Sequence, residues 1–367
     1  MAGQPVIDCA VVGAGPAGLA VSAALAVSGV DHVVLERGLA GETWRTQRWN
    51  SFRLNTPGWM NQMLGGQARG AFAAGAEVVQ RLEGLAAERP VRSGTHVAGL
   101  VPDGDGCVLQ TSDEVLQARA VVVATGDQNV PRVPPVANTL PDWIAQQHTA
   151  DYRGAGSLPA GGVLVVGSAQ SGCQIAEDLL SAGRRVVFAT SPAGRLPWRH
   201  RGGDSLEWMV DAGFYDQRPQ DLRDPSMINA SQPIVAAGGR SLSLQSLTRS
   251  GAMLVGRPLS MTGDSLLLDD SVEANITAGD VFAARVRTVV DEFIRQRGLA
   301  APPSDPDDTD TPVDVNPPTA LHLRDEGINS VIWCTGFTGD FSWLIPELLD
   351  TNGRPRRDGA TGPLPGL

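Results

Sequence analysis

The chain has 367 residues, of which 42% are hydrophobic and 19% charged, so it can form the cores of two full-sized domains. Its formal net charge of −11 argues against a nucleic-acid-binding or anionic-membrane surface, because such surfaces need clustered Lys and Arg. No apolar run reaches membrane-spanning length, and residues 1–6 lack the pattern of a secretory signal, so we expect neither a membrane association nor secretion.

Strand-like runs that end at glycine turns alternate with helical segments, which is typical of parallel α/β folds. A strand, a glycine turn, a helix and a second strand follow one another over residues 6–36. The same unit recurs over residues 163–189. Two such units predict two Rossmann-like, dinucleotide-binding domains in one chain.

The segments around these units predict the remaining elements. A helix over 76–88 precedes strand-like stretches that end at a Thr-Gly turn at 125–126. After the second unit, the pattern predicts a long helix over 274–297 and a strand over 330–337. Between them, residues 300–318 are rich in Pro and Asp and predict a surface connection.

The four cysteines are scattered along the chain, and none forms a C-x-x-C pair, which argues against a structural zinc site or a dithiol redox centre. Cys9, Cys107 and Cys334 lie in apolar strand-like runs, where an inert buried thiol is expected. A reducing cytoplasm therefore fits best, and no metal ion is predicted.

The first glycine turn has the pattern G-x-G-x-x-G directly after a strand and at the start of a helix. Gly13 makes the tight turn, Gly15 lets the backbone approach a pyrophosphate, and Gly18 allows close packing of helix and strand. Glu36 ends the second strand, where a carboxylate can bind the ribose hydroxyls of a dinucleotide. The predicted cofactor-binding residues of this unit also include Pro16, Ala17 and Arg37.

The second turn departs from this pattern because Ala169 stands at the middle glycine position. No acidic residue ends the next strand, whereas Ser191 and Arg195 follow it, and a ribose 2′-phosphate prefers a hydroxyl and an arginine. We therefore expect NADPH rather than NADH, although a structural repeat without a cofactor is the alternative. The residues predicted to bind it also include Gly167, Ser168, Gln170, Ser171 and Gly172.

These paired turns are the most specific part of a family resemblance. Over about residues 6–337 the chain resembles the class B flavin-dependent monooxygenases, which comprise the flavin-containing monooxygenases, the plant YUCCA enzymes and their bacterial relatives. The resemblance implies FAD at the first turn, in two glutathione-reductase-type domains. The implied FAD-binding domain is discontinuous, over 1–155 and 325–367, with an NADPH-binding domain inserted over 156–324.

Within this resemblance, the segment G-E-T-W-R at 41–45 matches the family's Gly-x-x-Trp segment. It implies that Thr43, Trp44 and Arg45 lie along the flavin's ribityl and pyrophosphate groups. For Trp44, a role as a core aromatic residue is the alternative.

The stretch F-R-L-N-T-P at 52–57 resembles the family's segment at the reactive face of the flavin, and it implies cofactor contact by Leu54. Asn55 matches an asparagine that helps to hold the oxygenated flavin in flavin-containing monooxygenases. A turn-forming role for Asn55 before Thr-Pro is the alternative.

Two Thr-Gly turns resemble the family's strand-ending turns near the cofactors. They comprise Ala124, Thr125 and Gly126 in the first half, and Thr335 and Gly336 in the second. His148 resembles part of the family's linker motif and lies either near the nicotinamide or in a solvated loop. The basic cluster 199–201 either meets an anion or is a solvated surface.

The resemblance implies a monooxygenase that uses FAD, NADPH and O2 to transfer one oxygen atom from a C4a-(hydro)peroxyflavin to a small organic substrate. The alternatives are an NADPH oxidase or flavin reductase without organic oxygenation, and a non-catalytic flavin-binding regulatory protein. The family usually continues into a final strand and helix, where residues 363–367 end this chain. Another segment, a partner or weaker flavin binding would account for that difference, and a homodimer is among the assemblies left open.

Overall fold

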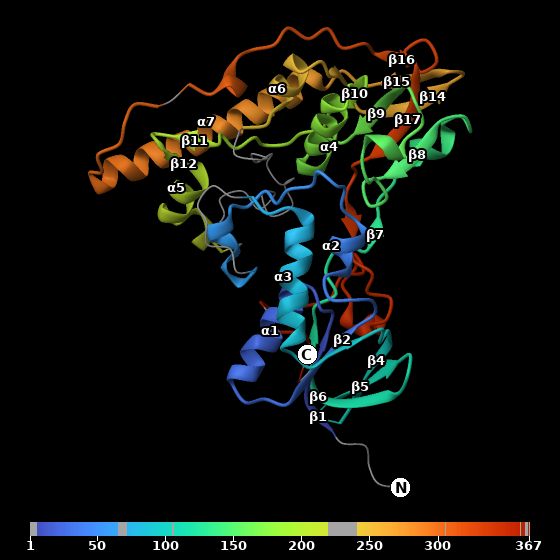
Figure 1. Ribbon diagram of the computed structural model, residues 1–367, viewed down its shortest axis with the longest axis vertical. Coiled ribbons are helices and arrows are strands. Elements are labelled where there is room, and N and C mark those ends of the chain that lie inside the picture. Colours follow the sequence, from blue (N-terminus) through green and yellow to red (C-terminus); the bar gives the residue numbers. More distant parts are fainter. Residues whose placement is uncertain are drawn as a thin grey trace.

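A computed structural model of the protein describes residues 6–64, 72–104, 106–218, 241–304, 306–359, 361–363 and 366. Figure 1 shows two lobes, one with the N-terminal strands and helices and the other with the elements coloured green to orange. Strands β7 (Val130–Pro131) and β18 (Phe337–Thr338) pair in antiparallel fashion between the lobes. The chain therefore passes from one lobe to the other and returns beside its own outgoing segment.

The first lobe contains a six-stranded sheet in the order β3-β2-β1-β6-β5-β4. β3, β2, β1 and β6 are parallel, and β6, β5 and β4 form an antiparallel meander. The strands are β1 (Ile7–Val12), β2 (His32–Glu36), β3 (Val91–Ser93), β4 (Val97–Asp103), β5 (Gly106–Thr111) and β6 (Val115–Val123).

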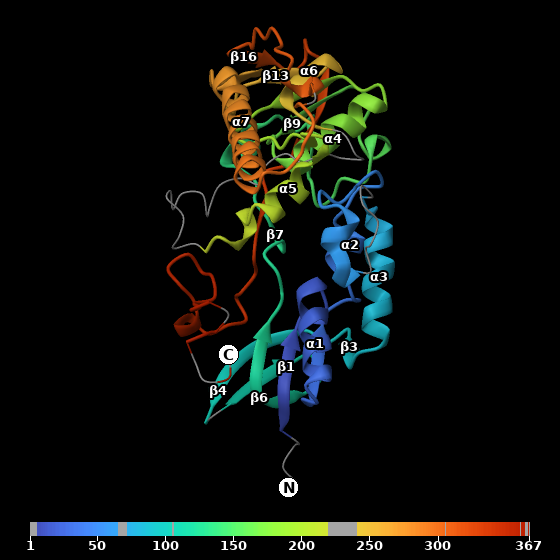
Figure 2. The same ribbon diagram turned by 90° about the vertical axis from the view of Figure 1, so that its left-hand side faces the viewer.

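Both faces of this sheet are covered. Because side chains alternate along a strand, Cys9 and Val11 of β1 pack on the helical side, and Ala10 and Val12 pack on the other side. Figure 2 shows α1 (Pro16–Val27) and α3 (Gly75–Ala87) on the helical side, near α2 (Glu42–Thr46). This burial fixes the end of β1, where the first glycine turn begins.

The second lobe contains a five-stranded, fully parallel sheet in the order β13-β10-β9-β17-β8. All five residues of β9 are buried, which is typical of a parallel strand covered on both faces. The strands are β8 (Ala145–His148), β9 (Gly162–Val166), β10 (Val186–Ala189), β13 (Met253–Val255) and β17 (Ile328–Trp333).

The second sheet is covered by α4 (Gln170–Ser181) on one face and by a small antiparallel sheet, β14-β15-β16, on the other. The long helix α7 (Val272–Arg297) runs along this lobe in Figure 2. The other strands and α-helices are β14 (Pro258–Thr262), β15 (Ser265–Leu268), β16 (Ala320–His322), β11 (Arg199–His200), β12 (Gly203–Asp204), α5 (Ser205–Asp211) and α6 (Leu244–Arg249).

The predicted α/β class with two Rossmann-like units is confirmed. β8 and β17 pair in the second sheet, although their residues lie in the ranges predicted for the first domain, and the predicted domain boundaries stay a prediction. Across the described ranges, no helix is both long and apolar enough to cross a membrane. The described part of the chain also contains no cluster of His, Cys, Asp and Glu that could hold a metal ion.

Candidate functional site: two nucleotide turns and adjoining cavities

The first glycine turn joins β1 to α1 with the geometry that its sequence predicts. Gly13 has φ +109°, and a Cβ there would lie 2.5 Å from the carbonyl oxygen of Ala124. A Cβ at Gly18 would lie only 1.8 Å from the carbonyl oxygen of Gly13, so helix and strand approach too closely for any side chain. At Gly15 a Cβ would meet nothing within 4 Å, so this position opens onto free space.

Glu36 ends β2 and holds the same turn in place. Its carboxylate accepts the N–H of Ala14 at 2.8 Å and the N–H of Gly38 at 2.9 Å. The predicted ribose-binding carboxylate is thus also a structural partner of the glycine turn. Each carboxylate oxygen can accept more than one hydrogen bond, so a ligand hydroxyl can still bind.

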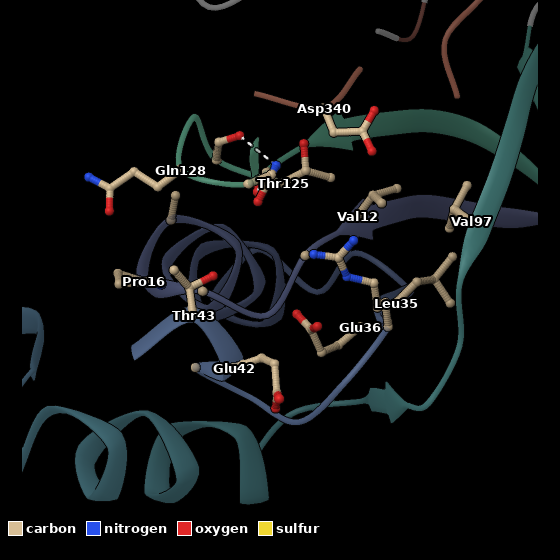
Figure 3. A pocket seen from close by; sticks show the side chains of 18 of the residues that line it. Val12, Pro16, Leu35, Glu36, Glu42, Thr43, Val97, Thr125, Gln128 and Asp340 are labelled. Carbon is tan, nitrogen blue, oxygen red and sulfur yellow. Dashed lines mark hydrogen bonds between the residues drawn. The ribbon is translucent and has the colours of Figure 1, made fainter. Parts of the chain in front are cut away.

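These residues surround a first cavity of about 490 Å³. In Figure 3, Glu36 and Thr43 lie on one side of the cavity, and Thr125 and Asp340 lie on the other. The buried Thr125 Oγ1 has no hydrogen-bond partner among the described residues, which leaves a polar atom free for a ligand. The predicted residues that line this cavity are Gly13, Gly15, Pro16, Ala17, Glu36, Arg37, Thr43, Trp44, Ala124, Thr125 and Gly126.

The second turn, between β9 and α4, repeats this backbone closely. Gly167 has φ +104° and lies against the carbonyl oxygen of Cys334, and a Cβ at Gly172 would lie 1.8 Å from the carbonyl oxygen of Gly167. Ala169 has φ −76° and ψ −173°, and Gly15 has φ −80° and ψ −175°. The backbone therefore tolerates the Ala169 methyl group without strain.

A pair of serines takes the place of the carboxylate in the second turn. The N–H of Ser168 lies 3.4 Å from Ser191 Oγ, Ser168 Oγ donates to the carbonyl oxygen of Ser191 at 2.9 Å, and the N–H of Ser191 donates back to Ser168 Oγ at 2.8 Å. The end of β10 thus presents a neutral hydroxyl where β2 presents a negative charge.

A second cavity of about 690 Å³ opens from this turn. Trp44, Arg48, Asp127 and Gln128 line both cavities, so the two cavities adjoin at these four residues. Trp49 is 4% exposed, and its Nε1 has no hydrogen-bond partner within the described ranges. The predicted residues that line the second cavity are Trp44, Leu54, Asn55, Gly167, Gln170, Ser171, Ser191, Thr335 and Gly336.

Segment 46–55 carries Asn55 into the second cavity and is held there by α4. The Gln174 side chain pairs with the Arg53 backbone, since its Oε1 accepts the N–H at 3.3 Å and its Nε2 donates to the carbonyl at 3.1 Å. Ser51 donates to Asp178 at 2.6 Å. The Asn55 amide makes no hydrogen bond with another described residue, so it is available to a ligand.

Two predicted cofactor cations do not reach the cavities. Arg45 points away and pairs with Glu83 of α3 at 2.9 Å. Arg195 is 4% exposed and is enclosed by Asp280 at 2.8 Å and Asp310 at 2.6 Å. Acidic partners from other elements thus hold both guanidinium groups. Three further predicted residues also line neither cavity, namely Gly18, Ser168 and Gly172, which pack inside the turns.

The two Thr-Gly turns are held by different side chains. Asn129 donates to the carbonyls of Thr125 and Gly126 at 3.3 and 3.1 Å. In the second turn, His148 Nδ1 accepts the N–H of Ala150 at 3.2 Å, so Nε2 donates to the carbonyl of Gly336 at 3.0 Å. His148 is buried, which excludes the solvated-loop alternative, and burial lowers its pKa.

Two other features of the sequence have structural roles. His200 and Arg201 bind Asp291 of α7 at 2.8 and 2.9 Å, so most of the basic cluster is tied to a helix away from the cavities. All four cysteines are buried and free, as expected for inert thiols, and burial raises the pKa of Cys334 to about 12.

Sequence reasoning missed Arg48, Trp49 and Arg257. Arg48 lies between the two cavities, and Arg257 lines the second cavity beside Pro258. Arg48 lies beyond the end of α2, and the sequence signal for it is an aromatic residue four positions earlier, Trp44, on which a guanidinium can stack. For Arg257 the sequence holds no such signal, because a loop after β13 brings it to the cavity.

Comparison with known proteins agrees with this geometry. The family model of the pyridine nucleotide-disulphide oxidoreductases matches residues 10–205. An uncharacterized CzcO-like oxidoreductase from Geobacillus kaustophilus is 26% identical over 96% of this chain and 87% of its own. The rice indole-3-pyruvate monooxygenase YUCCA1 is 33% identical over 48% of this chain and 45% of its own.

Solved structures share the fold. A flavin-containing monooxygenase from Stenotrophomonas maltophilia superposes with a TM-score of 0.62 at 20% identity, over 97% of this chain and 86% of its own. The protein belongs to the pyridine nucleotide-disulphide oxidoreductase family, and its resemblance to the class B flavin monooxygenases is confirmed. It is an enzyme of the flavin-dependent oxidoreductase class.

Proposed function

We propose that the protein is a monooxygenase that binds FAD in the first cavity and NADPH in the second, and that uses O2 to oxygenate a small organic substrate. The observation that carries this proposal is the pair of glycine turns, each opening onto a cavity, with the two cavities adjoining at Trp44, Arg48, Asp127 and Gln128. Two dinucleotides that extend from these turns meet at that junction. The FAD-binding domain would comprise 1–155 and 325–367, and the NADPH-binding domain 156–324.

The donor set of the first cavity fits FAD. The open space at Gly15, at the start of α1, suits a pyrophosphate, because free backbone N–H groups and the helix dipole favour an anion there. Glu36 would accept the ribose hydroxyls, and Thr125 Oγ1 offers a free polar atom. When bound, FAD supplies the two-electron redox chemistry.

The second cavity fits NADPH rather than NADH. Ser191 offers a hydroxyl where an acidic residue would repel a 2′-phosphate. Arg257 lines this cavity, whereas Arg195 does not, and it is the cation we assign to the 2′-phosphate. The Arg257 side chain is 70% exposed and has one weak ion pair, with Asp269 at 3.4 Å, so it can turn toward a phosphate. Asn55 would donate its free amide to a reacting oxygen or to the carboxamide of nicotinamide.

Residues of the chain would orient the two rings by holding the walls of the second cavity in place, as such chemistry requires. Gln174 and Asp178 hold segment 46–55 against α4, and His148 holds the turn at Gly336. Each contact fixes a wall of the second cavity.

Product analysis tests the proposal. Purified protein is loaded with FAD and supplied with NADPH and O2 alongside a panel of sulfides, amines, ketones and 2-oxo acids. We expect at least one compound to form an oxygenated product, while hydrogen peroxide falls by the same amount. Peroxide equal to the NADPH consumed with every compound would instead identify an NADPH oxidase.

The nicotinamide preference has its own test. We expect Arg257→Gln to raise the Kd of NADP⁺ about tenfold, the equivalent of ~1.4 kcal/mol, and to leave NAD⁺ binding unchanged. Arg195→Gln is no matched control, because Arg195 is buried and holds two acidic residues, Asp280 and Asp310, in place. The control is Arg249→Gln, because Arg249 lies outside the cavity, where its NH1 donates to the carbonyl oxygen of Thr311.

A further inference from the structure

Arg48 lies at the junction of the two cavities, which Asp127 also lines, and it forms no ion pair with any described residue. Its NH1 donates to the carbonyl oxygen of Gln47 at 2.9 Å, and its NH2 donates to Gln128 Oε1 at 2.7 Å. Its guanidinium carbon lies 4.9 Å from the ring centre of Trp44 and 5.4 Å from that of Phe52. Across the described ranges no carboxylate lies within ion-pair distance of it.

This arrangement leaves a positive charge poorly compensated. Carbonyl oxygens and ring faces solvate a guanidinium, but they do not neutralise it. Burial lowers the pKa of Arg48 to about 10, so the side chain stays charged at neutral pH. Arg45, three residues earlier in the chain, has Glu83 as a carboxylate partner and lines neither cavity. The charge of Arg48 is thus available to a ligand.

We propose that Arg48 is the positioning and charge-stabilising residue for the negative charge that FAD acquires when it is reduced. The inference rests on the proposed FAD and NADPH sites. Hydride transfer moves two electrons and one proton from the nicotinamide to the flavin. Since the second proton need not follow, the reduced ring would carry one negative charge, and the nicotinamide would be left oxidised as NADP⁺.

The position of Arg48 favours the flavin ring over the pyrophosphate. The pyrophosphate belongs at Gly13 and Gly15, which line only the first cavity. Arg48 lines both cavities, so it lies where the rings of the two cofactors meet. A charge there acts on the redox equilibrium more than on the anchoring of the dinucleotide.

The test is a potentiometric titration of bound FAD in Arg48→Met, Arg48→Lys and the matched control Arg45→Met, each preceded by measurement of the FAD Kd. We expect Arg48→Met to lower the equilibrium constant for two-electron reduction at least tenfold, which is about 30 mV. Arg48→Lys should keep most of the wild-type potential, and Arg45→Met should match the wild type.

Three outcomes separate the possibilities. An unchanged potential in FAD-loaded Arg48→Met would overturn the inference and leave the proposed function intact. Weaker FAD binding at an unchanged potential would also overturn it and assign Arg48 to the pyrophosphate. Absence of FAD binding by the wild-type protein would overturn the proposed function itself. If Arg48→Met does not fold, the comparison of Arg48→Lys with Arg48→Gln replaces it.

Discussion

The two glycine turns show how one backbone serves two electrostatic environments. A Cβ at Gly18 or Gly172 would lie at the same distance, 1.8 Å, from the carbonyl oxygen of Gly13 or Gly167. The φ and ψ angles of the two helix N-cap residues differ by only a few degrees. The turns differ instead in what the second strand presents, which is a carboxylate in one and serine hydroxyls in the other. The backbone geometry therefore suits both turns to a nucleotide, and in the proposed function the side chain that follows the second strand distinguishes their ligands.

The largest expected effect tests whether the two turns are structurally equivalent. Gly18→Ala and Gly172→Ala each place a Cβ 1.8 Å from a backbone oxygen that cannot move without displacing a strand. We expect each to lower the free energy of unfolding by about 3 kcal/mol or more. Urea denaturation with a probe in each lobe measures this. A loss in only one variant would mean that one turn relaxes and that the equivalence is superficial.

The next effect tests the side chain that distinguishes the turns. Ser191→Glu places a carboxylate at the residue whose side chain contacts the N–H of Ser168, as Glu36 contacts the N–H of Ala14 in the first turn. We expect the Kd of NADP⁺ to rise about 100-fold, or ~2.7 kcal/mol, through repulsion of the 2′-phosphate. NAD⁺ binding should be unchanged or tighter. Calorimetric titration measures both, with the neutral Ser191→Gln as the control. If that control loses as much affinity, crowding and not charge would be responsible.

Exchange of Gly and Ala tests the middle position of each glycine turn, which is Gly15 in the first and Ala169 in the second. Gly15→Ala adds a Cβ to open space at an unstrained backbone, so we expect normal folding and about tenfold weaker FAD binding, or ~1.4 kcal/mol. Ala169→Gly should tighten NADP⁺ binding by threefold or less and change stability by less than about 1 kcal/mol, because Gly is the better N-cap residue but makes the unfolded chain more flexible. Fluorescence titration of FAD and calorimetry of NADP⁺ measure the pair. Equal FAD affinity in Gly15→Ala would show that the pyrophosphate does not approach this residue.

The same comparison shows which features of the site can be predicted from the sequence. The glycine spacing predicts both turns because it acts through local backbone geometry, which neighbours in the sequence determine. The roles of the arginines cannot be predicted from the sequence in this way. The choice between Arg45 and Arg48 depends on Glu83 of α3, and the choice between Arg195 and Arg257 depends on Asp280 and Asp310 of distant elements.

Those acidic partners come close only in the folded chain. Nothing in the spacing of the arginines indicates which of them is neutralised and which is left for a ligand. Trp49 illustrates the same limit, because its unpaired Nε1 becomes evident only when its buried surroundings are known.

The smallest effect contrasts the two Thr-Gly turns, since Asn129 does not titrate and His148 does. Burial lowers the pKa of folded His148, so at pH above its ordinary value of about 6.5 both folded and unfolded chains are neutral and stability is complete. As pH falls below that value, the unfolded chain binds a proton that the folded chain resists. Stability is then lost, by at most ~1.4 kcal/mol per pH unit, until the folded pKa is passed.

The loss of stability at low pH should also be visible locally, at the hydrogen bond that His148 accepts. Protonation of Nδ1 breaks the hydrogen bond from the Ala150 N–H, so we expect amide exchange at Ala150 to accelerate from pH 7 to pH 5 relative to the intrinsic rate. Amides in the turn held by Asn129 should keep their protection. The variant His148→Gln should lose this pH dependence of stability. Equal acceleration in both turns would show that His148 is not the group that distinguishes them.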